Sequence, residues 1–242
     1  MEPFKAESFG FGQTAVQLNK YQVDDVSHKF GGGNVEANLW LPAAAREYHI
    51  SPKIEDYVLV PVPAMWTSIP NTNGDSVTLQ EFLRFNPEMG MQSFKTFRGK
   101  PTFLEHDNKD YTKAKGVILD VFLRPIKKFG NGKFYKLVML LAYDRTKDPM
   151  LVNTILNGEN NAYSVGFYYK AYTCSICNKT VGSGPRDQPC SHTLPRKGTY
   201  RQNDGRLVYR HCHDVVGFEC SSVVNPAYVT AISPILMDPS SL

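Results

Sequence analysis

Long hydrophobic runs are missing from this sequence of 242 residues. The longest apolar candidate, LVMLLAY at 137–143, is far shorter than the roughly 20 residues that a membrane-spanning helix needs. The amino-terminal stretch MEPFKAESFG lacks the basic start and apolar core of a signal peptide. We therefore expect a soluble, intracellular protein with no membrane partner.

A strong excess of one charge is also missing. Lysine and arginine number 27 against 23 acidic residues, which leaves a formal net charge of +4. No basic stripe or aromatic platform marks a nucleic-acid surface, so no specific nucleic-acid partner is predicted. With 42% hydrophobic and 21% charged residues, the composition is that of a globular protein able to bury a core.

Cysteine is scarce, and its odd count of five means that not all of the thiols can pair within one chain. Four of the five lie in residues 173–213, together with His192, His211 and His213. In a reducing compartment such a cluster favours a metal site or free thiols over disulfides.

The order of apolar and turn-forming segments predicts one domain with an arm and an insertion. Residues 1–36 are polar and end near three consecutive glycines, so we predict a flexible N-terminal arm or propeptide. Residues 37–242 form the domain. Its hydrophobic pattern breaks at about 173–213, which is rich in Gly, Pro and Lys and reads as an insertion that needs more than a core to order it.

Local patterns place strands and helices within the domain. We predict strands at 57–66 (with its prolines at an edge or bulge), 100–108 running into a turn, 116–126, 134–143, 162–172 and 215–232. A hairpin turn is predicted at 129–133. Helices are predicted at 77–85, capped by Asp75 or Ser76, and at 148–160, capped by Asp148 with Pro149 in the first turn.

Ser164 and His106 are candidate catalytic residues. Ser164 follows a helix and a tight turn near the start of a strand, in YSVGF, where Gly166 would let a substrate backbone come close. His106 ends an apolar strand in LEHDN, flanked by acids that could tune its pKa. A serine attacks a carbonyl only when a base removes its proton, and either residue alone is more often structural.

Glu219 is the candidate third member of the site. Alternation through FECSSVV places Glu219, Ser221 and Val223 on one face of a strand. If Phe218 and Val224 face the core, Glu219 faces the other side, where a carboxylate could fix the tautomer of an imidazole. Asp214, His211 and His213 are nearby competitors for this role.

The joint order of these motifs resembles the prohead (capsid maturation) serine proteases of tailed bacteriophages. The matching pieces are FLEHD (103–107), ILNGENNAYSVGF (155–167) and FECSSVVNPAY (218–228). The resemblance implies that Ser164 is the nucleophile, His106 the base and Glu219 the third member of a triad. It covers roughly residues 55–232 and is interrupted by the insertion.

The resemblance also implies a fold and a biological setting. The expected fold is α+β, a mainly antiparallel, barrel-like sheet with surrounding helices, similar to the herpesvirus assemblins. The substrates would be phage scaffold, core and major capsid proteins, and the protease itself, cut after Glu inside the prohead in the host cytoplasm. Related proteases form dimers or rings, so a homo-oligomer is left open.

The insertion carries a predicted structural zinc site. Cys174 and Cys177 form a C-x-x-C knuckle, and after twelve intervening residues Cys190 and His192 follow as C-x-H. Two pairs of soft ligands around a Gly/Pro-rich loop suit tetrahedral Zn²⁺. Cys212, or His211 and His213, could replace His192 as the fourth ligand.

Two other function classes compete with the protease. A zinc-ordered, non-catalytic virion structural or binding protein would fit the knuckle but leaves the order of His106, Ser164 and Glu219 unexplained. A zinc hydrolase is disfavoured because the sequence has no H-E-x-x-H motif and thiolate-rich sites are usually closed.

Overall fold

The computed structural model describes residues 16–17, 37–126, 134–184, 187–193, 200–201, 204–228 and 231. Of the predicted arm at 1–36, only the two-residue strand β1 (Val16–Gln17) is described, and the rest of that prediction lies outside the described residues. The predicted turn at 129–133 also lies outside them. Within the described part of the chain, no helix is both long and apolar enough to cross a membrane.

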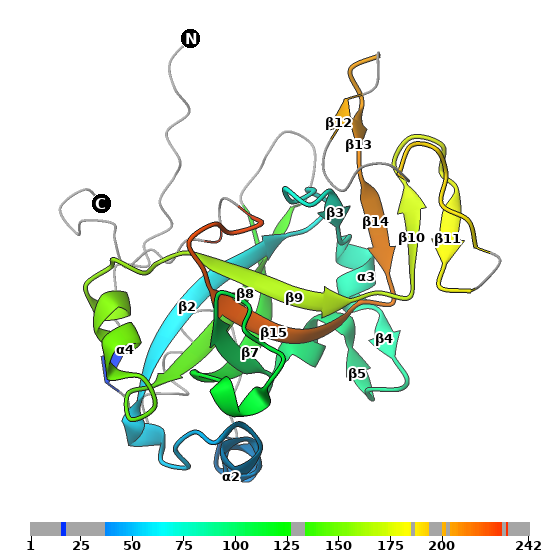
Figure 1. The fold of residues 1–242 in the computed structure, drawn as a ribbon. Coiled ribbons are helices and arrows are strands. Elements are labelled where there is room, and N and C mark those ends of the chain that lie inside the picture. Colours follow the sequence, from blue (N-terminus) through cyan, green and yellow to red (C-terminus); the bar gives the residue numbers. More distant parts are fainter. Residues whose placement is uncertain are drawn as a thin grey trace.

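The main body is a seven-stranded sheet that curls into a half-barrel (Figure 1). Every neighbouring pair is antiparallel except β6 and β15, which run parallel. The strands, in their order across the sheet, are β1, β2 (Tyr57–Trp66), β8 (Tyr135–Asp144), β7 (Gly116–Pro125), β6 (Pro101–Leu104), β15 (Val216–Ser222) and β9 (Tyr163–Tyr168). The predicted α+β class with a mainly antiparallel, barrel-like sheet is therefore confirmed.

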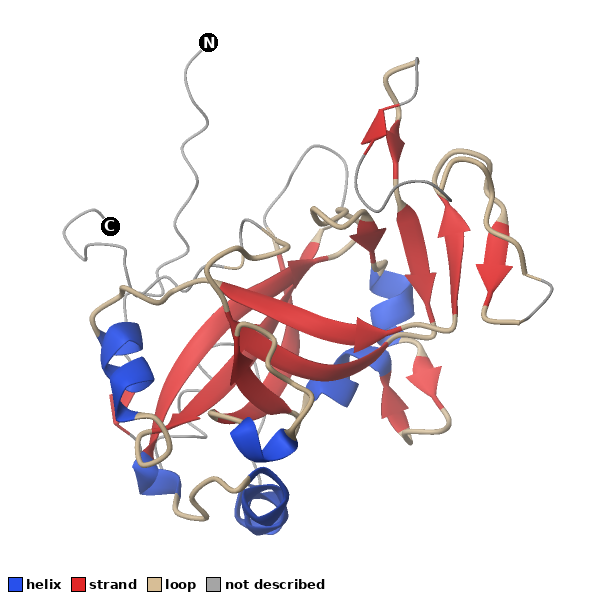
Figure 2. Ribbon diagram, in the orientation of Figure 1, coloured by secondary structure: helices blue, strands red, loops and turns tan. Residues whose placement is uncertain are grey.

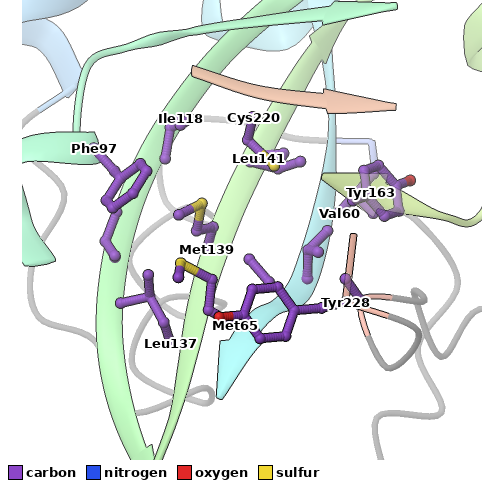
Figure 3. Packing of buried hydrophobic residues seen from close by; sticks show 14 of the residues in the cluster. Val60, Met65, Phe97, Ile118, Leu137, Met139, Leu141, Tyr163, Cys220 and Tyr228 are labelled. Atoms are coloured by element: carbon purple, nitrogen blue, oxygen red, sulfur yellow. The ribbon is translucent and has the colours of Figure 1, made fainter. Parts of the chain in front are cut away.

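Both faces of the long strands are buried, because alternate side chains pack into two hydrophobic clusters. On the inner face, Met65, Leu137 and Met139 pack with Tyr228 (Figure 3). On the outer face, strand residues such as Leu59 and Leu140 pack against helix α2 (Ala37–Tyr48). The helix contributes residues spaced for one face, namely Leu41, Ala44, Ala45 and Tyr48.

The prolines of β2 lie where the sequence predicts. The register between β2 and β8 shifts between Pro63 and Met65, which marks a bulge. On its other side β2 pairs only with β1, at Val58 and Leu59, within the described residues. Pro61 and Pro63 therefore leave no ladder hydrogen bond unmade on that side.

The two predicted helices are present, with one corrected cap. Helix α3 (Leu79–Leu83) is capped by Thr78, whose hydroxyl accepts from the backbone N–H of Glu81. Asp75 and Ser76 instead form strand β3, because they pair with β14. Helix α4 (Pro149–Leu156) begins as predicted, with the Asp148 carboxylate accepting from the N–H of Leu151.

Short elements complete the main body. They are the 3-10 helices η1 (Ile54–Asp56), η2 (Ser93–Phe97) and η3 (Tyr111–Lys113), and the hairpin strands β4 (Phe85–Asn86) and β5 (Met91–Gln92). In α4, Leu151, Val152 and Ile155 are buried, whereas Met150 is 77% exposed. The buried stripe of that helix therefore runs through Leu151 and not Met150.

The predicted strand at 162–172 is two strands, because the chain leaves the half-barrel after Tyr168 and enters a second sheet (Figure 2). The order in that four-stranded sheet is β11 (Thr180–Gly182), β10 (Ala171–Cys174), β14 (Arg210–His213) and β3. A separate pair, β12 (Tyr200–Arg201) and β13 (Leu207–Val208), extends from it. Between β9 and β15, the chain thus forms the short strands β10 to β14 in place of a continuation of the half-barrel.

Candidate active site and metal site

His106 and Glu219 form a direct side-chain pair. His106 lies in the turn that follows β6, and Glu219 lies within β15, the parallel neighbour of β6. The His106 Nδ1 and the Glu219 Oε1 are 2.7 Å apart. Glu219 is completely buried, whereas the His106 side chain is 39% exposed. Nδ1 therefore donates to the carboxyl, and Nε2 is the ring nitrogen left to act on another group.

The turn that carries His106 is held against β15 by Glu105. Glu105 and His106 have φ angles of 49° and 56°, both in the left-handed region that non-glycine residues rarely adopt. The Glu105 N–H donates to the carbonyl of Ser222 at 2.9 Å, and the Glu105 Oε1 accepts from the N–H of Val224 at 2.7 Å. These two bonds, one on each side of Glu105, fix the turn to the end of β15.

The pKa of His106 is raised above its ordinary value. The hydrogen bond to Glu219 is the main cause. Partial burial opposes the shift, and the charges of Glu219 and Glu105 add to it. An imidazole with a buried carboxyl on Nδ1 has the arrangement of a general base whose protonated form is stabilised.

Ser164 lies on the same face of the sheet as this pair. In the antiparallel pairing of β9 and β15, Ser164 stands opposite Ser221, and Gly166 stands opposite Glu219. Directly opposed residues of an antiparallel pair share a face, with Cβ atoms about 4.5–5.5 Å apart. Within the described residues no hydrogen bond joins Ser164 to His106. Catalytic hydrogen bonds commonly tighten only when substrate binds, so this geometry is compatible with a serine–histidine couple.

Gly166 leaves space for two neighbouring side chains. A Cβ built at this position would lie 2.4 Å from the Glu219 Oε1 and 2.4 Å from the Phe218 ring. The glycine therefore makes room for the acid and the aromatic ring.

The predicted alternation of the last strand needs a correction at Phe218. The register of β15 shifts between Gly217 and Glu219, so Phe218 is the extra residue of a bulge. Its ring stacks on Tyr168, with centroids 4.4 Å apart, instead of entering the core. Val224, also predicted to face the core, is 78% exposed, and Cys220 takes the core position.

The competitors of Glu219 lie elsewhere. Asp214 pairs with Arg84 at 3.0 Å. The His213 Nε2 lies 2.8 Å from the hydroxyl oxygen of Thr173, and the ring of His211 packs edge-on against Tyr209. Among these acidic and imidazole groups, Glu219 is the one that contacts His106.

Sequence reasoning missed two residues of this site. The Ser221 hydroxyl donates to the second carboxyl oxygen of Glu219. The alternation had placed Ser221 beside Glu219, but a common residue type gave no signal of a role. Glu105, the anchor of the turn, was seen only as a nearby charge, because its partner is a backbone N–H 119 positions away.

The second cluster of reactive side chains lies in the insertion. Cys174 ends β10, Cys177 lies in the turn after it, and Cys190 and His192 lie in the loop 187–193. One potential ligand atom from each of the four residues lies within 4.8 Å of all the others. This Cys/His cluster could hold a metal ion. The proposed substitutes for His192 are not part of it, and the Cys212 thiol instead lies 3.8 Å from Asp75.

The chemistry of the Cys/His cluster suits a metal ion. The Nδ1 of His192 is buried and has no hydrogen-bond partner, which is costly unless something else satisfies it. Burial raises the pKa of the Cys174 thiol. Burial also acts to raise the pKa of Cys190, but hydrogen bonds from Thr193 and His192 outweigh it and lower that pKa to about 6. A thiolate is thus available near neutral pH without a large energetic cost.

No family model, no curated protein and no solved structure matches this chain. The functional conclusion therefore depends on the two clusters themselves.

Proposed function

We propose that this protein is a serine endopeptidase with Ser164 as nucleophile, His106 as general base and Glu219 as the group that orients the base. The observation that carries the proposal is the placement of all three on one face, from β9, the turn after β6, and β15. Three separate segments converge there, and the acid is completely buried against the imidazole.

The chemistry follows from the order of these groups. Nε2 of His106 takes the proton of Ser164 as its oxygen attacks the scissile carbonyl, and later gives a proton to the leaving amine. Glu219 keeps Nδ1 protonated, so that Nε2 is the basic nitrogen, and it stabilises the imidazolium that forms. General acid–base catalysis of this kind contributes typically about 10²–10⁴-fold to a rate.

The motifs that resemble phage prohead proteases suggest the substrates. We propose that the enzyme cleaves scaffold, core and major capsid proteins after Glu, and also itself, inside the prohead within the host cytoplasm. The curled half-barrel with its parallel β6–β15 pair supports a fold similar to the herpesvirus assemblins.

We further propose that the Cys/His cluster holds a structural Zn²⁺. Three thiol sulfurs and one imidazole nitrogen are the donor set of closed, tetrahedral zinc sites. The ion would tie the end of β10 to the loop 187–193, in a segment with few buried apolar residues of its own. A closed site leaves no position for a catalytic water, so the ion's role would be to order the insertion.

The Cys/His cluster alone would also fit a zinc-ordered, non-catalytic virion structural or binding protein. That alternative gives no reason for a buried glutamate on a half-exposed histidine beside a strand serine.

Labelling with a fluorophosphonate tests the protease assignment without knowledge of the substrate. Such reagents phosphonylate serines that a neighbouring base activates. We expect one adduct on Ser164 in the wild type, none in Ser164→Ala, and strongly reduced labelling in His106→Gln. Ser68→Ala, at an exposed serine in the turn after β2, is the control and should label like wild type. Labelling that survives Ser164→Ala would refute the assignment.

A further inference from the structure

The second oxygen of the Glu219 carboxyl has a partner of its own. Oε1 accepts from the Nδ1 of His106 at 2.7 Å, and Oε2 accepts from the hydroxyl of Ser221. Glu219 and Ser221 are both completely buried. Since they are two residues apart on β15, their side chains leave the strand on the same face.

A buried carboxyl oxygen without a donor is costly, so the two bonds together decide how the Glu219 carboxyl is turned. If Oε2 lost its donor, the carboxyl could lower its energy by rotating toward other donors, and Oε1 would leave its line with Nδ1. Three other titratable groups among the described residues interact with His106 or Glu219. Glu105 faces His106 from its own turn, and the Tyr143 hydroxyl and the Cys220 thiol are the titratable groups influenced by Glu219 from within the core.

Ser222 offers an internal comparison on the next position of the strand. It is as deeply buried as Ser221, and its hydroxyl also donates to a side chain, the amide oxygen of Asn160. Because adjacent strand residues point to opposite faces, that bond lies away from the His106–Glu219 pair. The two serines are alike in size, burial and bonding, and they differ in which partner they hold.

We propose that Ser221 is a positioning residue of the active site: its hydroxyl fixes the Glu219 carboxyl so that Oε1 stays aligned with His106 Nδ1. The inference rests on the proposed protease function for its catalytic consequence. Its structural part, the control of the imidazole by a serine that never touches it, stands without that function. The site is then a chain of four side chains, from Ser164 through His106 and Glu219 to Ser221.

The test compares Ser221→Ala with Ser222→Ala by two readouts. The first is the NMR titration of the His106 ring. In Ser221→Ala we expect the pKa of His106 to fall toward its ordinary value, because the hydrogen bond that His106 donates to Glu219 is the main cause of the raised pKa. Ser222→Ala should leave that titration as in the wild type. The second readout is cleavage, where Ser221→Ala should lower kcat about tenfold with little change in KM, as expected for a group that acts in the transition state.

A second pair of variants covers the case in which Ser221→Ala fails to fold. Thr and Val have nearly the same shape, and only Thr carries a hydroxyl. Ser221→Thr should therefore keep the raised pKa of His106, and in Ser221→Val this pKa should fall. An unchanged His106 pKa in Ser221→Ala, or an equal fall in Ser222→Ala, would overturn the proposal. Failure of the protease assignment would look different: the wild type would cleave nothing, or Ser164→Ala would cleave like the wild type, while the titrations would still decide the role of Ser221.

Discussion

At the scale of single residues, the site depends on two consecutive left-handed residues, Glu105 and His106. Each costs about 1–2 kcal/mol relative to an ordinary backbone conformation. The turn persists because Glu105 bonds β15 through both its N–H and its carboxylate. The strained turn orients the His106 side chain toward Glu219.

The pKa of His106 leads to a prediction for Glu219→Gln. A general base must be neutral, so the raised pKa sets the acid limb of the kcat/KM profile above the ordinary histidine value of 6.5. In Glu219→Gln this limb should move to lower pH, because the hydrogen-bonded carboxylate is gone. The rate should fall on the order of a thousandfold, since an amide no longer fixes the tautomer. Asp107→Asn, which removes a carboxylate next to His106 in the sequence that pairs with Lys113 and leaves the Glu219 bond in place, is the control.

The same shift fixes the sign of a stability effect. Because folding raises the pKa of His106, its pair with Glu219 stabilises the protein fully below the unfolded pKa of about 6.5. That contribution is lost as the pH rises through the folded pKa. Denaturant unfolding of wild type and Glu219→Gln should therefore differ more at pH 5.5 than at pH 9, and an equal difference at both would contradict the pair as described.

At the scale of elements, helix α4 sets the chain on its path to Ser164. Its start rests on Asp148, which caps the helix and also lies 2.8 Å from Lys115. Burial acts to raise the pKa of Asp148, but Lys115 and the N–H of Leu151 outweigh it, so the net pKa is lowered. The cap therefore stabilises the fold at neutral pH, and this stability is lost as the pH falls through the folded pKa.

Asp148→Ala should cost about 1 kcal/mol of unfolding free energy at neutral pH, the usual value of an N-cap. Asp107→Ala is the matched control, because Asp107 pairs with Lys113 on an exposed surface and caps no helix. It should change stability by less than about 0.5 kcal/mol. Urea unfolding at pH 7 measures both. Equal effects of the two substitutions would mean that the cap does not support α4.

Elements with a strong local signal could be predicted from the sequence. The start of α4 at Asp148-Pro149 and the alternating strands β2, β7 and β8 lie where predicted, because caps and side-chain periods are local properties. The cap of α3 could not be predicted, because Asp75 and Ser76 pair with a strand some 135 positions away and are not available as caps. The bulge at Phe218 escaped for the same reason, since register depends on the partner strand.

The candidate site divides in the same way. The motifs and their order predicted that His106 and Glu219 would act together, and the two residues are in contact. The spacing of the ligands alone predicted the cluster of Cys174, Cys177, Cys190 and His192. The contacts of Ser221, Glu105 and Gly166 could be recognised only in the three-dimensional structure. These residues contact backbone atoms or side chains that the fold brings close, and the residue type alone does not predict such a contact.

At the scale of the whole molecule, the insertion is continuous with the strands that carry the candidate active site. The chain passes from β9 into β10 and returns through β14 into β15, and both pairs are antiparallel. The two antiparallel pairs thus follow each other along the chain, with Ser164 and Glu219 in the pair β9–β15 and Cys174 at the end of β10 in the pair β10–β14. The Cys/His cluster is therefore joined through the backbone to the strands that carry Ser164 and Glu219.

The zinc proposal predicts a local loss of order when the ion is removed. Native mass spectrometry should find one zinc ion per chain in the wild type and in Cys212→Ser, and none in Cys174→Ser or Cys190→Ser. After chelation, amide hydrogen exchange should rise in β10, β11 and β14 and stay low in β2, β7 and β8, which the core holds. Equal metal loss in Cys212→Ser and Cys174→Ser would remove this assignment.

The most direct measurement for the central claim is intact mass spectrometry of the wild type and Ser164→Ala, each incubated with a recombinant scaffold or capsid protein. We expect the wild type to trim itself or the substrate at defined sites after Glu, and Ser164→Ala to leave both whole while keeping its fold and its metal. The same fragments from Ser164→Ala and wild type would contradict the assignment of Ser164 as the nucleophile.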